Sequence, residues 1–156
     1  MPVAERVIAQ EVFGFLRPEQ INAISNAAEV IRYQAGDTVY FQGEKAENLF
    51  VVLQGGVSLR LPGKEGVSVP IDEASKGALF GSCLCFGIDA YATTAQCTQD
   101  SELMRIGAVV LMDLLDEDPI MGYAIQRRMS QVYFRRYLET MRKLQAIVMN
   151  LPLEAE

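Results

Sequence analysis

The 156-residue sequence contains no histidine and no tryptophan, and it has only three cysteines. Histidine is the side chain that most often acts as a general base or binds a metal ion, so its absence excludes Ser-His and Cys-His nucleophile pairs. A zinc site would have to be built from three cysteines and a carboxylate. The sequence also lacks Gly-x-x-x-x-Gly-Lys, Gly-x-Gly-x-x-Gly and Gly-x-Ser-x-Gly motifs. We therefore predict that the protein is not an enzyme and has neither a metal site nor an obligatory cofactor.

Targeting signals and long apolar runs are also missing. The odd number of cysteines and the lack of a secretion signal indicate free thiols in a reducing compartment. No apolar run approaches the ~18 residues that a membrane-spanning helix needs. Half of the residues are hydrophobic and 22% are charged, which is typical of a folded globular domain. We expect a cytoplasmic protein of about one domain that has no membrane partner.

Charge is distributed unevenly along the chain. Residues 1–118 contain eight Lys/Arg against seventeen Asp/Glu, whereas residues 119–151 contain six Lys/Arg against Glu139 alone. A basic segment beside an acidic body fits a nucleic-acid or membrane partner, and it also fits a helix whose arginines face solvent and pair with the acidic body. We favour the second interpretation.

Helical spacing at both ends of the chain flanks a centre of short strands. Residues 3–31 are predicted to form short helices, one of which begins at Pro18 and has apolar residues at Ile21, Ile24, Ala28 and Ile31. The predicted strands, separated by glycine-containing turns, are residues 38–41, 48–53, 57–61, 67–71, 92–97 and 103–106. Short strands at this spacing indicate an antiparallel sandwich, jelly roll or barrel.

Two helices are predicted after the strands. Residues 109–115 form a short helix, and Pro119 begins a long one that extends to Asn150, about 46 Å at ~1.5 Å per residue. One apolar seam on it alternates steps of four and three and runs through Tyr123, Arg127, Ser130, Phe134, Tyr137, Met141, Leu144, Val148 and Leu151. A second stripe, which we expect to pack on the body, consists of Met121, Ala124, Ile125 and Val132. A helix with two apolar faces needs two partners, so we predict a homodimer through Phe134, Tyr137, Met141, Leu144 and Val148.

Three stretches carry a resemblance to a known family. They are Ala35-Gly36-Asp37, the run Gly43-Glu44-Lys45-Ala46-Glu47-Asn48-Leu49-Phe50-Val51-Val52-Leu53-Gln54-Gly55, and Leu79-Phe80-Gly81. With the helical flanks, the chain resembles the cyclic nucleotide-binding domain, and more closely the sensor half of the catabolite activator/FNR superfamily. The resemblance implies an α+β fold in which an antiparallel β jelly roll (a double-stranded β-helix, or cupin-like barrel) with N-terminal short helices occupies residues 1–118. A long C-terminal dimerisation helix then occupies residues 119–151.

The resemblance also places a ligand site in a segment that we call the cassette, residues 80–93. Its predicted ligand-binding residues are Phe80, Gly81, Ser82, Cys83, Leu84, Tyr91, Ala92 and Thr93. In family members that bind nucleotides, a Glu takes the ribose hydroxyl and an Arg neutralises the cyclic phosphate. Here Ser82 stands in place of the Glu, and Tyr91, or Ala90 in an alternative register, stands in place of the Arg. No Arg or Lys lies between Lys76 and Arg105.

These departures predict weak or absent binding of cyclic AMP and cyclic GMP, in a cavity whose wall near Tyr91 lacks positive charge. A phosphate without its cationic partner loses about 1.5–3 kcal/mol. Two routes to a replacement cation are open. Arg127 or Arg128 of the long helix, from a second copy, can supply it as a possible anion contact, or Arg105 can turn inward.

The sequence leaves two roles open for the cysteines and two for the chain. Cys83, Cys85 and Cys97 fit a redox, metal or haem-thiolate sensor, and they also fit small buried side chains, which we favour. The chain fits a stand-alone sensor that binds a small molecule or a nucleotide and signals through its long helix to a downstream protein. It also fits a ligand-free dimeric scaffold, or a sensor fragment of a transcription regulator. Because no winged helix follows Asn150, we expect no direct DNA binding.

Overall fold

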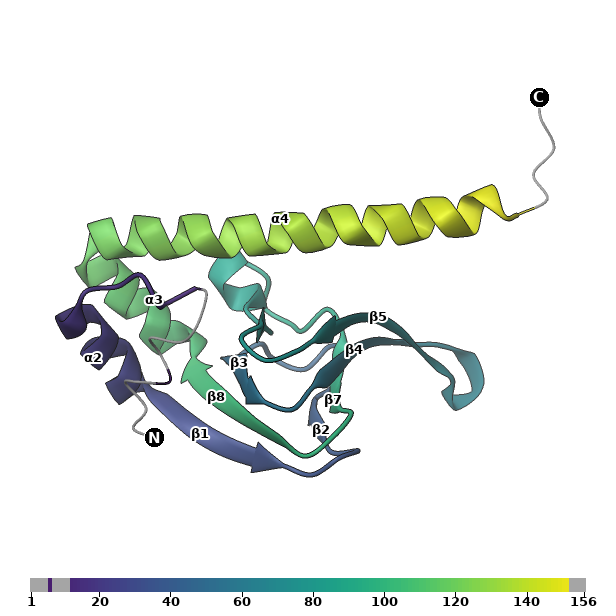
Figure 1. Ribbon diagram of the computed structural model, residues 1–156, viewed down its shortest axis with the longest axis horizontal. Coiled ribbons are helices and arrows are strands. Elements are labelled where there is room, and N and C mark those ends of the chain that lie inside the picture. The colour runs from purple at the N-terminus through teal and green to yellow at the C-terminus, as the bar shows by residue number, and fades with distance from the viewer. Residues whose placement is uncertain (1–5, 7–11, 152–156) are drawn as a thin grey trace.

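Two four-stranded antiparallel sheets face each other, and a long helix crosses over them (Figure 1). This computed structural model describes residue 6 and residues 12–151. The elements are α2 (Pro18–Ala27), β1 (Ala28–Tyr33), β2 (Thr38–Tyr40), β3 (Asn48–Gln54), β4 (Val57–Pro62), η1 (Lys64–Gly66), β5 (Ser68–Ala74), β6 (Leu79–Phe80), η2 (Cys83–Phe86), β7 (Thr94–Cys97), β8 (Ser101–Gly107), α3 (Ala108–Glu117) and α4 (Pro119–Met149). The strand orders are β1-β8-β3-β6 and β2-β7-β4-β5. The predicted jelly roll with helical flanks is confirmed.

The central strand β3 connects the two halves of the core. Successive side chains on a strand point to opposite faces. Leu49, Val51 and Leu53 therefore pack in the cluster beneath the helices. Phe50 and Val52 pack in the cluster between the two sheets. The almost continuous apolar run of this strand is explained by burial on both of its faces.

The helix predicted to continue as far as Ile31 ends at Ala27 instead. Ile21 and Ile24 are buried on α2, as the helical spacing predicts. Ala28 begins β1, which pairs with β8 from Ala28 opposite Ile106 to Tyr33 opposite Ser101. Pairing along the whole strand outweighs a helical spacing that two further apolar residues fit by coincidence. Apart from Arg6, the helical segment predicted over residues 3–11 lies outside the described residues.

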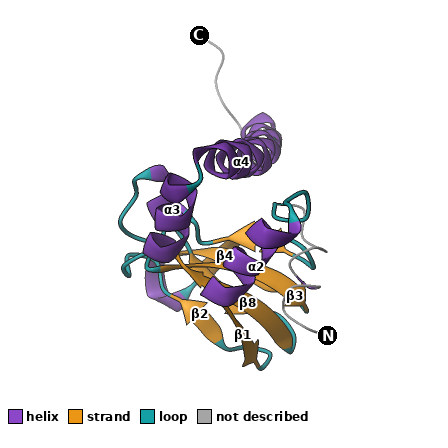
Figure 2. Cartoon of the chain, turned by 90° about the vertical axis from the view of Figure 1, so that its left-hand side faces the viewer, coloured by secondary structure: helices purple, strands orange, loops and turns teal. Residues whose placement is uncertain are grey.

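Helix α4 begins where the sequence predicts and packs on the body through its first half. The Asp118 side chain caps it by accepting a hydrogen bond from the backbone N–H of Met121 at 3.1 Å. Met121, Ile125 and Met129 are buried against the cluster beneath the helices. Gly122 permits this close approach, since a Cβ there would lie 2.5 Å from the Leu115 carbonyl oxygen. Figure 2 views α4 nearly end-on, lying along one side of the body next to α3.

None of the helices within residues 12–151 combines the length and the hydrophobicity that a membrane span requires.

Candidate functional site

A cavity of about 380 Å³ lies between the sheet β2-β7-β4-β5, the cassette and α4. Its walls are largely apolar, with a few hydroxyls, one thiol and one guanidinium. The lining residues are Tyr40, Leu59, Phe80, Gly81, Ser82, Cys83, Phe86, Ile88, Ala92, Thr93, Tyr133 and Arg136. A concave, mostly apolar space of this size with a few polar groups is typical of a small-molecule site.

The entry of the cassette depends on Gly81. This residue has φ +77°, a conformation that L side chains rarely adopt, and a Cβ on it would lie 3.2 Å from the Tyr40 ring and 3.4 Å from those of Phe50 and Tyr91. The tight turn after β6 directs the chain into the short helix η2. Ser82, at the start of this turn, is buried at the floor of the cavity.

Three contacts fasten the cassette to α4. The Ser82 hydroxyl donates a hydrogen bond to the Tyr133 hydroxyl at 2.5 Å. The Gln126 side-chain amide donates to the Cys85 carbonyl oxygen at 3.3 Å. The Phe86 and Tyr133 rings meet edge to face with centroids 5.4 Å apart. Burial raises the pKa of Tyr133, which keeps its hydroxyl neutral. The helix is therefore part of the cavity wall.

Arg136, one turn beyond Tyr133, brings a cation to the cavity. Its guanidinium lies over the Tyr133 ring, 5.2 Å from the centroid. Its Nε is 3.8 Å from a carboxylate oxygen of Asp72 on β5. Its Nη1 is buried and has no hydrogen-bond partner among the described residues. None of the cassette residues that line the cavity is Lys or Arg, and its cation comes from α4.

Six of the eight predicted cassette residues line this cavity: Phe80, Gly81, Ser82, Cys83, Ala92 and Thr93. Leu84 instead packs against both core clusters. Tyr91 lies beneath the wall, stacked on Tyr40 with ring centroids 3.6 Å apart. Its hydroxyl donates to the Asn48 carbonyl oxygen at 2.7 Å, and burial raises its pKa. The side chain at the position of the family arginine therefore joins the core, and Tyr40 separates it from the cavity.

The arginines proposed as replacement cations lie elsewhere within the chain. Arg127 and Arg128 line a separate hollow, where the Arg128 guanidinium sits 5.0 Å from the centroid of the Phe15 ring. Arg105 donates to the Glu29 carboxylate at 2.6 Å on the pair β1 and β8, so it does not turn inward. A contribution from Arg127 or Arg128 of a second copy stays a prediction.

The signal that identifies Arg136 is present in the sequence. Met121, Ile125 and Met129 form the body-facing stripe of α4. Continuing it by a step of four gives Tyr133, and a further step of three gives Arg136. Residues at these spacings share one helix face. The stripe predicted to pack on the body ended at Val132 and therefore included neither Tyr133 nor Arg136.

The three cysteines have separate surroundings and are all free thiols. Cys83 lines the cavity, Cys85 is half-buried beside α4, and Cys97 is buried between the sheets. Burial raises the pKa of Cys85 and of Cys97. Because the thiolate is the reactive form, a raised pKa disfavours redox chemistry and metal binding at these two positions. Within the part of the chain described, no three His, Cys, Asp or Glu side chains group closely enough to hold a metal ion.

The predicted dimer residues project into solvent from the second half of α4. Phe134 is 60% exposed and Leu144 is 52% exposed, although both are large and apolar. The other exposed seam residues are Tyr137, Met141, Val148 and Leu151. Dimerisation through this seam stays a prediction.

Comparison with known proteins agrees with the fold. The family described as the cyclic nucleotide-binding domain matches residues 30–118. The lysophospholipase nte1 of Aspergillus oryzae is 26% identical over 125 residues, which are 80% of this chain but 8% of that protein. The chain therefore spans only a small part of this relative.

Two solved structures have the same architecture. A cyclic nucleotide-binding domain from Methylobacillus flagellatus KT superposes with a TM-score of 0.80 at 15% identity, covering 97% of this chain and 85% of that one. The sensor domain of the transcriptional regulator DNR from Pseudomonas aeruginosa superposes with a TM-score of 0.71 at 18% identity, covering 97% and 95%. At these identities the likeness establishes the fold.

Proposed function

The chain belongs to the cyclic nucleotide-binding domain family, a family of regulatory domains, and we propose that it is a non-enzymatic sensor module. It binds a small molecule in the cavity between the cassette and α4. Cyclic AMP and cyclic GMP bind weakly or not at all. The bound state is transmitted through α4, which assembles two copies and acts on a downstream protein partner.

One observation carries this proposal: a single helix both lines the cavity and bears the exposed apolar seam. Tyr133 and Arg136 face the cavity, while Phe134 and Tyr137, next to them in sequence, are exposed on α4. A ligand that displaces Tyr133 from Ser82 breaks one of the contacts between the cassette and α4, and we infer that the helix then shifts or rotates. Any such shift changes the position of the seam, which gives the two-state element that signalling requires.

The composition of the cavity argues against a cyclic nucleotide. No Asp or Glu is among the described residues that line the wall, so a ribose hydroxyl finds no carboxylate acceptor there. Ser82, which stands in the position of the family glutamate, already donates its hydroxyl to Tyr133. Polar atoms of the base and ribose would lose water without gaining partners, at about 1–3 kcal/mol for each unpaired group.

Titration calorimetry of the full chain with cyclic AMP and cyclic GMP tests the ligand part of the proposal. We expect neither nucleotide to bind with a submicromolar Kd. Submicromolar binding of either would overturn it. A thermal-shift screen runs in parallel, since a ligand at 100 times its Kd adds about 2.7 kcal/mol of stability.

The signalling part is tested by linkage between ligand binding and dimerisation. A ligand found in the screen is expected to change the dimer Kd measured by sedimentation, and Tyr133→Phe, which removes the hydroxyl bonded to Ser82, is expected to reduce that change. Tyr123→Phe is the matched control, because it removes an exposed hydroxyl from the same helix outside the cavity, and it should leave the change in the dimer Kd as in the wild type. If no compound in the screen binds while the chain is a stable dimer, the exposed seam favours a ligand-free interaction scaffold.

A further inference from the structure

We propose, on the basis of the proposed function, that the cavity selects small amphipathic monoanions: molecules with one carboxylate on an apolar body. Arg136 binds the carboxylate, and the apolar wall formed by the jelly roll and the cassette holds the apolar part of the ligand. The ligand is thus anchored to α4 by its charge and to the jelly roll by its apolar part.

The anchor is a cation that is already positioned but incompletely paired. Arg136 Nη1 is buried without a hydrogen-bond partner, and the separation of 3.8 Å between Nε and the Asp72 carboxylate is too long for a hydrogen bond. Stacking over the Tyr133 ring fixes the plane of the guanidinium. An unpaired buried donor is unfavourable, and an incoming carboxylate would pair with the guanidinium fork.

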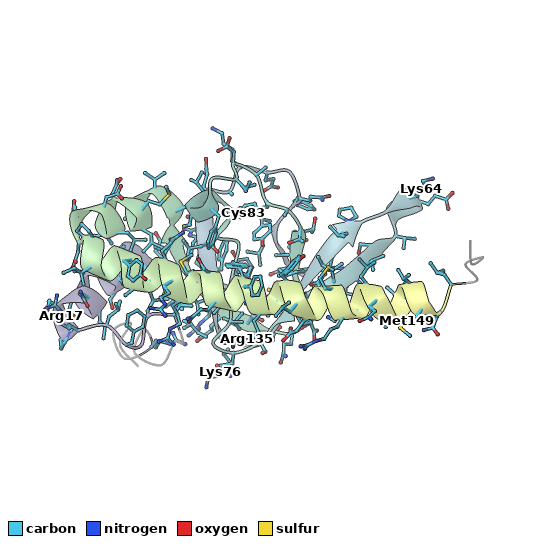
Figure 3. The ribbon with its side chains drawn as sticks, turned by 90° about the horizontal axis from the view of Figure 1, so that it is seen from above. Arg17, Lys64, Lys76, Cys83, Arg135 and Met149 are labelled. Atoms are coloured by element: carbon cyan, nitrogen blue, oxygen red, sulfur yellow. The ribbon has the colours of Figure 1, made fainter. Side chains whose placement is uncertain are left out.

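The position of Arg136 limits the ligand to one anionic group. Figure 3 views α4 from above, with Cys83 on one side of the helix and Arg135 and Lys76 on the other. Arg135 and Lys76 line a different hollow, which also contains Glu139 and is bordered by Arg136. Arg136 is therefore the one Lys or Arg among the described residues that line the cavity with Cys83.

The rest of the wall fits an apolar body. Leu59, Phe80, Phe86 and Ile88 line the cavity, and its volume of about 380 Å³ lies in the range of small-molecule sites. An aromatic ring or a medium-length alkyl chain meets these side chains without leaving polar atoms unpaired. A second charge on the ligand would find no counter-ion in the wall.

A second prediction concerns Asp72. Its carboxylate is the acidic group nearest to Arg136 in the described chain, so it competes with the ligand for the guanidinium. Neutralising it in Asp72→Asn should strengthen carboxylate binding several-fold. A purely structural role of Asp72 in orienting Arg136 would instead weaken binding.

The test is calorimetry of the full chain with decanoate and 4-phenylbutyrate, each paired with its neutral amide. We expect the wild type to bind the acids at least ten-fold more tightly than the amides. Arg136→Gln should weaken binding of the acids roughly ten- to a hundred-fold and leave the amides unchanged. Arg136→Lys should restore part of the affinity, and Arg142→Gln, an exposed charge on the same helix, should have no effect.

The outcomes separate this inference from the proposed function. If acids and amides bind equally, or if Arg136→Gln binds both acids like the wild type, the monoanion assignment is wrong while a sensor of apolar molecules stands. If none of the four compounds binds, the ligand class is wrong and the thermal-shift screen decides the proposed function. If cyclic AMP binds at submicromolar concentration, both are wrong. Far-ultraviolet circular dichroism confirms that each variant is folded.

Discussion

The two halves of α4 have different surroundings, although they form one uninterrupted helix. In the proximal half, residues 119–133, Met121, Ile125 and Met129 are buried against the body. In the distal half, residues 134–149, Phe134 and Leu144 are exposed. A helix of 31 residues that buries apolar side chains against the body only in its first half is longer than its own domain requires.

The difference shows that, in the described structure, the body of the chain covers one of the two apolar stripes of the helix and leaves the other exposed. The apolar stripe of the proximal half is buried against the body of the same chain. The distal half meets β5 through polar groups, since the Lys143 amine donates to the Ile71 carbonyl oxygen at 3.4 Å. Its apolar seam has no equivalent cover among the described residues, and a second copy is the partner that a self-complementary heptad seam fits. Arg136 lies at the junction of the two halves.

The largest effect should come from a charge placed in the distal seam. Leu144→Asp is expected to raise the dimer Kd by at least ~100-fold, because an unpaired charge buried at an interface costs about 3–5 kcal/mol. Sedimentation equilibrium at micromolar concentration measures it. Ala146→Asp, which lies on the same helix but outside the seam, is the control and should leave the Kd unchanged. A wild type that is monomeric at these concentrations would show that the distal half has another partner.

Truncation of matched isoleucines in the two halves should come next in size. Ile125→Ala removes a fully buried side chain from the proximal half and should lower the free energy of unfolding by about 2–5 kcal/mol. Ile147→Ala removes the same atoms from a position that is 60% exposed and outside the seam, so we expect about 0.5 kcal/mol or less. Urea denaturation measures both. Equal losses would contradict the division of the helix into a packed and an unpacked half.

The fold was predictable because its signals are local. Glycine turns such as Gly36, Gly43 and Gly55, each with positive φ, separate the strands and set their spacing. Pro119 marks the start of α4, and the double burial of β3 follows from its apolar run. The end of α2 was placed too late because strand pairing with β8, which is remote in sequence, decided the conformation from Ala28 onward.

The candidate site was only partly predictable because it joins segments distant in the chain. Gly81 and Ser82 were predicted from the resemblance that Leu79-Phe80-Gly81 bears to the start of the family's cassette. Arg136 was missed because it lies more than fifty residues from Ser82 in the sequence and does not belong to the predicted dimer seam. Tyr91 was misplaced because sequence position alone does not determine which face of the wall a side chain occupies. Its stacking on Tyr40 decides that.

The smallest effect concerns the start of the proximal half, where Asp118 caps α4. The backbone N–H of Met121 and the Gln20 side chain both donate to its carboxylate, and these bonds lower the pKa of Asp118. A carboxyl group whose pKa is lowered by folding stabilises the fold at every pH above its ordinary, unfolded-state pKa. This contribution is lost as the pH falls through the folded-state pKa. Asp118→Asn keeps an oxygen acceptor and removes the charge, so its Tm should lie slightly below that of the wild type at about pH 7.

The Tm values of the wild type and Asp118→Asn should converge as the pH falls through the lowered pKa of Asp118, where the wild-type carboxyl group takes up its proton. Asp118→Ala, which removes the cap itself, should lower the Tm further, by about 2–4 °C at neutral pH, and should stay below the other two in acid. Thermal unfolding followed by circular dichroism from about pH 7 to about pH 3 measures all three proteins. A constant gap between wild type and Asp118→Asn across this range would mean that the charge does not contribute to anchoring the proximal half. The hydrogen bonds alone would then fix where the helix begins.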